Sequence, residues 1–159
     1  MDLGIRGRTA LVCGASKGLG RACADALAAE GVNLVITGRD ATALEAAARQ
    51  IAGAHGVAVT PAAGDITTDA GQASALAACP APDILVNNAA GPPLGDWRHF
   101  TREQWLAAAD SNMVAAILLT RAVIDGMAAR GFGRIVNITS AMVKAPIPPL
   151  ALSVAARLG

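Results

Sequence analysis

The sequence predicts an α/β domain built on a doubly wound parallel sheet, and two features of the chain lead to this fold class. Short, continuous apolar runs alternate with longer, alanine-rich amphipathic stretches, which is the pattern of strands covered on both faces by helices. A glycine-rich turn joins the first apolar run to the first amphipathic stretch. The 159 residues, 53% of them hydrophobic, fit one domain with a sizeable core.

The expected elements follow from this alternation. Five apolar runs predict strands at residues 9–13, 33–37, 57–62, 84–87 and 134–139. Helices are expected at residues 19–30, from 40 or 42 to about 55, 68–78, 101–130 and from about 152. Gly31 closes the first helix, and either Asp40 or Thr42 caps the second. Thr101 and Gln104 have the spacing of a capping box and open the long helix.

Composition excludes several classes of function. The 13 Lys and Arg residues against 12 Asp and Glu leave a net charge of +1, and aromatic residues are only 3%, so neither a basic groove nor a stacking platform for nucleic acid is expected. Three cysteines without a C-x-x-C pair predict neither a disulfide framework nor a metal site. The apolar, uncharged run at residues 111–120 is too short for a membrane span and predicts a buried helix, and residues 1–6 lack the pattern of a signal peptide. A soluble, cytoplasmic protein is therefore expected.

The glycine-rich turn is the strongest local motif. It has the spacing G-x-x-x-G-x-G between a strand and a helix, where glycines let the backbone approach a pyrophosphate and the helix N-terminus supplies free N–H groups. The candidate cofactor-binding residues here are Gly14, Ser16, Lys17, Gly18, Leu19 and Gly20.

Two other motifs also place a glycine-rich turn between a strand and a helix. A P-loop ends in Gly-Lys-Ser/Thr, and Leu19 after Gly18 breaks that pattern. Gly14 to Gly18 does fit the G-x-S-x-G nucleophile elbow, so a serine hydrolase with Ser16 as nucleophile and His55 or His99 as base is a remote alternative.

The end of the second expected strand indicates which dinucleotide would bind. Arg39 stands at the strand tip, where an arginine suits a ribose 2′-phosphate and an acid would suit a free 2′-hydroxyl. Lys17 adds a second cation inside the glycine turn. Asp40 is expected to cap the following helix, so the two cations favour NADP over NAD.

A series of polar residues then follows the expected strands along the chain. The glycine turn, Asp65, Asn87-Asn88-Ala89, Asn112 and Ser140, in this order, resemble the short-chain dehydrogenase/reductase family, and most closely its 3-oxoacyl-carrier-protein-reductase-like members. The resemblance implies a Rossmann-type sheet of order 3-2-1-4-5, continued by strands 6 and 7 in complete members, and a nicotinamide cofactor. It implies that Asp65 contacts the adenine and Asn87 the ribose; Ile66 and Ala89 are further candidate cofactor contacts.

The same resemblance assigns the catalytic positions. It implies that Ser140 holds the substrate oxygen and that Asn112 binds a water of the proton relay. A tyrosine and a lysine are expected thirteen and seventeen residues after this serine, but Ser153 and Arg157 occupy those positions, and the chain has no tyrosine at all. Lys144 is a possible local substitute for the missing acid.

Three functional hypotheses remain open at this stage. The first is an NADP-dependent oxidoreductase with a non-standard site acting on a small carbonyl or alcohol. The second is a module that binds NADP without turnover, and the third is the hydrolase. Family domains run to roughly 250 residues, so residues 1–159 are expected to be the N-terminal part of one dinucleotide-binding domain. A homo-oligomer, dimer or tetramer, is implied by the resemblance.

Overall fold

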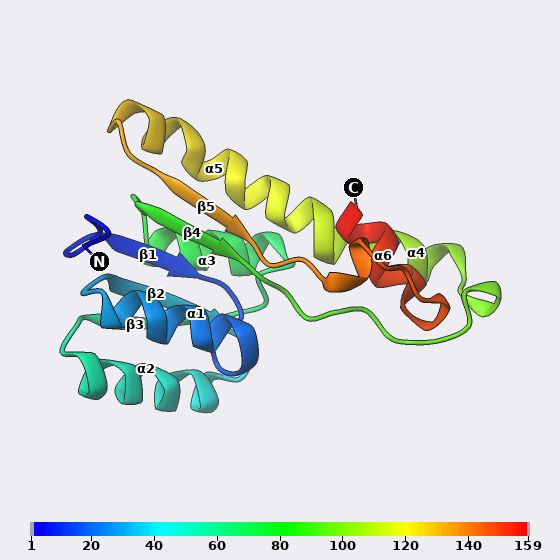
Figure 1. Cartoon of the computed structure of the whole chain (residues 1–159), viewed down its shortest axis with the longest axis horizontal. Coiled ribbons are helices and arrows are strands. Elements are labelled where there is room, and N and C mark those ends of the chain that lie inside the picture. The colour runs from blue at the N-terminus through cyan, green and yellow to red at the C-terminus, as the bar shows by residue number, and fades with distance from the viewer. Residues whose placement is uncertain (1, 159) are drawn as a thin grey trace.

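A single parallel sheet forms the centre of the molecule (Figure 1), in a computed structural model that describes residues 2–158. Its strands are β1 (Thr9–Val12), β2 (Asn33–Gly38), β3 (Val59–Ala63), β4 (Ile84–Asn87) and β5 (Arg134–Asn137). The order is β3-β2-β1-β4-β5, and every neighbouring pair is parallel. The predicted fold class and strand order are therefore confirmed.

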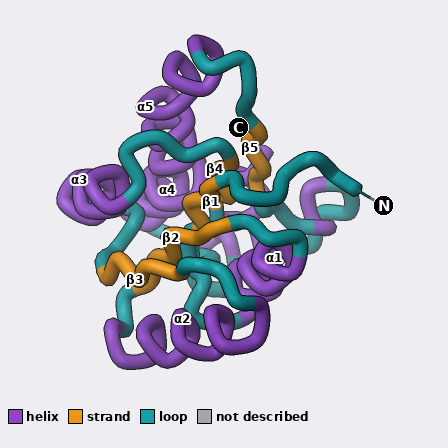
Figure 2. The backbone as a smooth tube through the Cα atoms, turned by 90° about the vertical axis from the view of Figure 1, so that its left-hand side faces the viewer, coloured by secondary structure: helices purple, strands orange, loops and turns teal. Residues whose placement is uncertain are grey.

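Helices cover both faces of this sheet (Figure 2). The helices of the chain are α1 (Gly18–Ala29), α2 (Ala41–His55), α3 (Asp69–Ala78), α4 (Arg102–Ala109), α5 (Ala115–Ala129) and α6 (Ala151–Leu158). One core cluster joins α1 and α2 to one face, and a second joins α3 and α5 to the other. The alternate residues Leu11 and Val12 of β1 enter different clusters, because successive side chains of a strand point to opposite faces.

The boundaries of several elements differ from the expected ones. The third strand begins at Val59 rather than at residue 57, and the fifth ends at Asn137 rather than at residue 139. The cap of α2 is Asp40, whose carboxylate accepts a hydrogen bond from the backbone N–H of Ala43, whereas Thr42 lies inside the first turn. Of the two expected caps, Asp40 is thus the correct one.

The long helix expected over residues 101–130 is continuous but not uniform. Thr101 and Gln104 form the predicted capping box at its start. A π-helical segment, Asp110–Val114, then separates α4 from α5. Such wide turns are rare, and they are frequently found at functional sites. The departure coincides with Ser111 and Asn112, which are mediocre helix formers.

This helical stretch, Arg102–Ala129, is also apolar and long enough to cross a membrane when judged by length and composition alone. No membrane span was expected here from the sequence, because only the ten uncharged residues 111–120 were counted. A mean hydropathy taken over eighteen residues instead tolerates isolated charges. The face that carries Leu119, Val123 and Met127 is buried against the sheet, as in the core helix of an α/β domain. A mostly buried core helix passes the same test, whereas 22% of this window is buried, and a single helix of this kind is weak evidence for a membrane span.

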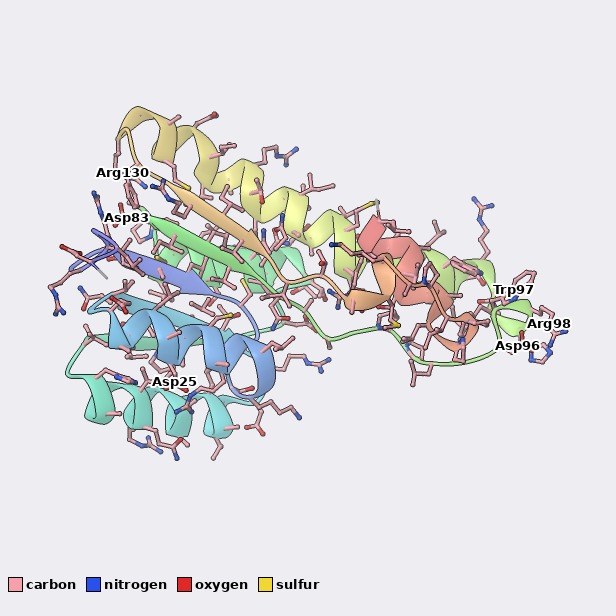
Figure 3. All side chains as sticks on the ribbon, in the orientation of Figure 1. Asp25, Asp83, Asp96, Trp97, Arg98 and Arg130 are labelled. Atoms are coloured by element: carbon pink, nitrogen blue, oxygen red, sulfur yellow. The ribbon has the colours of Figure 1, made fainter. Side chains whose placement is uncertain are left out.

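A smaller lobe extends beyond the carboxyl ends of the strands (Figure 1). It contains α4 and α6, whose buried residues Ala108, Leu152 and Ala156 pack together beside Phe100 and Trp105. At its tip is the 3₁₀ helix Trp97–His99, and Figure 3 shows Asp96, Trp97 and Arg98 there, far from the strands. Within the lobe, the segment that follows β4 lies next to the segment that follows β5, and the Gly95 backbone N–H donates to the Pro149 carbonyl. Both segments extend from the carboxyl ends of the strands, where the predicted site residues lie.

Candidate functional site

The glycine turn lies at the carboxyl end of β1 and is held by the end of β2. Gly14 has a positive φ of 61°, a conformation that L side chains rarely adopt. The backbone N–H of Gly14 donates to Thr37 Oγ1 at 3.3 Å, and that of Ala15 donates to the Thr37 carbonyl at 2.8 Å. A Cβ on Gly20 would lie only 2.3 Å from the Gly14 carbonyl oxygen. Helix α1 therefore packs directly on the turn, and only glycine permits this approach.

The N-terminus of α1 is arranged in a way that suits an anion. Its cap residue, Lys17, makes no side-chain capping hydrogen bond, and the first turn contains no acidic residue. The first backbone N–H groups are thus left without a side-chain acceptor, and the helix dipole is not neutralised by a carboxylate. Lys17, Gly18 and Leu19 are all exposed, so a ligand could reach this end of the helix.

Arg39 and Asp40 are adjacent at the end of β2, but the structure gives them different roles. Arg39 is exposed and directly follows β2, whose carboxyl end lies at the same edge of the sheet as the glycine turn. The neighbouring Asp40 is used as the cap of α2, where its Oδ1 lies 3.0 Å from the Ala43 backbone nitrogen. The carboxylate that would mark a free ribose hydroxyl is therefore engaged, whereas Arg39 makes no recorded hydrogen bond or ion pair within residues 2–158.

Asp65 and Ile66 follow β3 in a tightly bonded loop. Asp65 Oδ1 accepts hydrogen bonds from the backbone N–H of Thr67 at 3.0 Å and from the Thr67 hydroxyl at 2.8 Å. These two bonds, backbone first, lower the pKa of Asp65, and the positive charge of Arg39 lowers it further. Asp65 is thus held as a carboxylate that the positive charge of Arg39 stabilises.

Two asparagines at the end of β4 anchor the centre of this edge. Asn87 is buried, and its Nδ2 donates to Thr120 Oγ1 at 3.2 Å and to Asn137 Oδ1 at 2.9 Å. Its own Oδ1 is buried and has no hydrogen-bond partner among the residues that the structure describes. Asn88 Nδ2 donates to the Cys13 carbonyl at 3.3 Å, which ties β4 to the start of the glycine turn. Sequence reasoning assigned no site role to Asn88; only its place beside Asn87 gave a signal.

A cavity of about 660 Å³ opens between the ends of β4 and β5, helix α5 and the last turn of α6. It brings together five of the predicted site residues, namely Ile66, Asn87, Ala89, Asn112 and Arg157. Ser140 and Ser153 lie outside its lining. Among the lining residues that the structure describes, Arg121 and Arg157 carry charge and none is acidic, so the cavity favours a ligand with negative charge.

Asn112 sits in the π-helical segment at the wall of this cavity. Its Nδ2 donates to Ser111 Oγ at 2.9 Å, and Ser111 in turn donates to the Ala107 carbonyl at 2.8 Å. Asn112 Oδ1 is buried and has no partner within the described residues. A buried acceptor of this kind is expected to bind water or a ligand group. Ser111, which fixes the amide, was not singled out from the sequence as a site residue.

Ser140 follows β5 and caps a short 3₁₀ helix, Ala141–Val143. Its Oγ accepts from the Met142 backbone N–H at 3.2 Å, which leaves the hydroxyl proton available for donation. Lys144, the possible substitute acid, is exposed at the end of that short helix. The structure records no hydrogen bond between Lys144 and another predicted site residue within residues 2–158.

Ser153 and Arg157 are joined on α6. Arg157 Nε donates to Ser153 Oγ at 3.2 Å, and Arg157 Nη1 donates to the Ile138 carbonyl at 2.7 Å. Burial lowers the pKa of the Arg157 guanidinium from its ordinary value. Arg157 thus connects the end of β5 to the position where the family resemblance expects a phenol.

The elbow interpretation of Ser16 finds little support in this geometry. Ser16 packs beside Gly38, near the start of α2, whereas His55 is the last residue of α2 and lies 3.8 Å from Asp25. Figure 3 shows Asp25 between α1 and α2, and His99 belongs to the distant tip of the small lobe. Within residues 2–158, neither histidine forms a hydrogen bond with Ser16.

Comparisons with known proteins agree with this arrangement. A family model described as short chain dehydrogenase matches residues 8–158. L-xylulose reductase of Cavia porcellus is 38% identical over 141 residues, which are 88% of this chain and 56% of the reductase. The structure of L-sorbose reductase from Gluconobacter frateurii, complexed with NADPH and L-sorbose, has a TM-score of 0.93 at 31% identity and covers 99% of this chain.

A further solved structure, provisionally named a β-ketoacyl-ACP reductase, has a TM-score of 0.87 at 36% identity. This chain covers 63% of that protein and 62% of the sorbose reductase. It spans a little over half the length of the curated relatives that it matches.

Proposed function

The chain belongs to the short-chain dehydrogenase family, and from that membership we propose that it is an NADP(H)-dependent oxidoreductase. The proposed reaction transfers a hydride between the nicotinamide and a small carbonyl or alcohol substrate. The choice of cofactor rests on one edge of the sheet. There the N-terminus of α1 has no side-chain cap and no acidic residue in its first turn, and the cations Lys17 and Arg39 are both exposed. The neighbouring carboxylate of Asp40 is used as the cap of α2.

The residues at this edge fit a dinucleotide phosphate. The close packing at Gly20 leaves the backbone of the glycine turn open to a pyrophosphate, which the α1 N–H groups would bind. Lys17 and Arg39 would hold the 2′-phosphate, and Asp65 with Ile66 would contact the adenine. Asn87 and Ala89 would lie against the ribose, as the cavity lining allows. When bound, NADPH supplies the hydride.

The proposed proton chemistry rests on the chain's own hydroxyl groups. Ser140, whose oxygen already accepts from Met142, would donate its proton to the substrate oxygen and orient it. Ser153 Oγ accepts from Arg157 Nε, so its proton is also free, and the guanidinium would stabilise negative charge left on that oxygen. Asn112 Oδ1 would hold a water that returns the proton to the site.

A second function is favoured by one specific observation. The chain contains no tyrosine, and a serine hydroxyl is a weaker acid and a shorter side chain than a phenol. Loss of a positioned acid typically reduces a rate by about 10² to 10⁴-fold. The alternative is therefore a module that binds NADP(H) as a sensor or partner subunit without turnover.

Consumption of NADPH by the whole protein separates these two functions. The relatives reported above are named for reduction of L-xylulose, L-sorbose and a β-ketoacyl group, so the panel contains ketoses and β-ketoacyl thioesters. Turnover above the background of a Ser140→Ala variant supports the oxidoreductase. Tight NADPH binding without turnover on any member of the panel supports the binding module. We further propose a small-molecule substrate, which the same panel tests, and a cytoplasmic location. We also propose a homo-oligomer, which the mass of the same preparation in solution tests.

A further inference from the structure

Gln72 is a buried polar residue in α3 that joins two segments of the proposed cofactor site. It is 8% exposed. Its Nε2 donates to the Ile66 carbonyl at 3.1 Å and to the Ala115 carbonyl at 3.2 Å. One amide group therefore uses both of its N–H donors on the backbones of two different segments.

These two segments belong to opposite parts of the proposed site. The Ile66 carbonyl lies in the loop whose carboxylate, Asp65, is proposed to contact the adenine. Ala115 is the first residue of α5 and directly follows the π-helical segment that carries Asn112. Gln72 thus fixes the adenine side of the site relative to the helix on the catalytic side.

The sequence pattern of α3 does not explain a glutamine at this position. Ala75 and Cys79 lie three and seven residues later on the same helix face and are buried against the sheet. That spacing expects an apolar residue at 72. An amide is costly to bury unless its groups are bonded, and local rules of this kind tend to be broken at functional sites.

We infer that Gln72 is a positioning residue, which holds the Asp65–Ile66 loop against the start of α5 so that the adenine half of the cofactor binds in register with Asn112. The inference deepens the proposed function and rests on it. Gln72 touches neither cofactor nor substrate in this role, and acts through the two carbonyl groups that it holds.

The test compares Gln72→Met with two control variants in the whole protein. Methionine keeps the length and volume of the side chain but removes both donors. Gln50→Met makes the same chemical change at an exposed glutamine of α2. Ala75→Gly weakens α3 on the same face without removing either hydrogen bond, and so matches a general loss of stability.

Three measurements are made on each variant: urea unfolding, the Kd for NADPH and for 2′,5′-ADP, and amide hydrogen exchange of the ligand-free protein. Gln72→Met is expected to raise both Kd values about tenfold and to accelerate exchange at residues 65–68 and 111–116. Both controls should keep the wild-type affinities, although Ala75→Gly unfolds at lower urea. This combination would not result from a merely structural role.

Wild-type affinity for both ligands in Gln72→Met would overturn the inference alone, as would an equal loss of affinity in Ala75→Gly. A wild-type protein that binds neither ligand would overturn the proposed function and this inference with it.

Discussion

Replacement of Gly20 by alanine tests the packing that shapes the glycine turn. The added Cβ would lie 2.3 Å from the Gly14 carbonyl oxygen and 2.8 Å from the Cys13 carbonyl oxygen, and both are backbone atoms. Ordinary contact begins at 3.4 Å, so α1 must move away from the turn by about 1.1 Å, the difference between 3.4 and 2.3 Å. Gly20 is buried, and the atoms that a Cβ would meet are backbone rather than flexible side chains, so the clash is relieved only by moving the helix or the turn.

The cost follows from that displacement. Overpacking of this kind costs about 1–3 kcal/mol, and the better helix propensity of alanine returns about 0.5–1 kcal/mol. We expect Gly20→Ala to lower the free energy of unfolding by about 1–2 kcal/mol. Because the N–H groups at the start of α1 move with the helix, the Kd for NADPH should also rise by at least about tenfold.

A matched glycine in α2 serves as the control. Gly53 is exposed, and a Cβ added there would meet nothing within 4 Å. Gly53→Ala should therefore raise the free energy of unfolding by about 0.5–1 kcal/mol and leave the Kd unchanged. Urea unfolding and a fluorescence titration with NADPH measure both quantities. A Gly20→Ala protein with undiminished stability and wild-type affinity would refute the packing argument.

Three further predictions concern single side chains. Because the pKa of Asp65 is lowered on folding, its carboxylate stabilises the folded state above its ordinary pKa, and this contribution is lost as the pH falls through the lowered value. Asp65→Asn should thus be less stable than the wild type at neutral pH, with the difference closing in acid; a difference that persists in acid would contradict the assignment. Burial raises the pKa of Cys13 to about 12, so a thiol reagent at pH 8 should label the partly buried Cys23 faster than the fully buried Cys13 in the folded protein; mass mapping of the labelled peptides checks this, and prompt labelling of Cys13 would show that the carboxyl end of β1 is not buried. The double variant Ser153→Tyr, Arg157→Lys should raise kcat on an accepted carbonyl by about 10² to 10⁴-fold, and no gain over the wild type would show that the phenol is not the missing element.

Much of the fold could be predicted because its signals are local. Continuous apolar runs such as residues 84–87 identify buried strands, and Thr101 with Gln104 identifies a helix start within four residues. The choice between Asp40 and Thr42 as cap could not be made, because both are good capping residues two positions apart. The π-helical turn at Asp110–Val114 was not predicted, because the sequence pattern indicates one continuous helix over residues 101–130 and does not show where its turns widen.

The part of the candidate site that could be predicted consists of residues whose type and position at the end of a strand identify them. The glycine turn, Arg39 and Asp65 all follow a strand directly, and the ends of parallel strands meet at one edge. The bonds of Asn88 to Cys13 and of Gln72 to Ala115 were not predictable, since each joins residues 43 or more positions apart. Such partners depend on the packing of whole elements, which no local pattern encodes.

The central claim is a cofactor site that prefers NADP(H), and a paired titration of the whole protein with NADPH and NADH tests it most directly. The account predicts saturable binding of NADPH, binding of NADH that is weaker by about tenfold or more, and loss of most of that preference in Arg39→Ala. A protein that binds neither cofactor, or that binds NADH as tightly as NADPH, would contradict it.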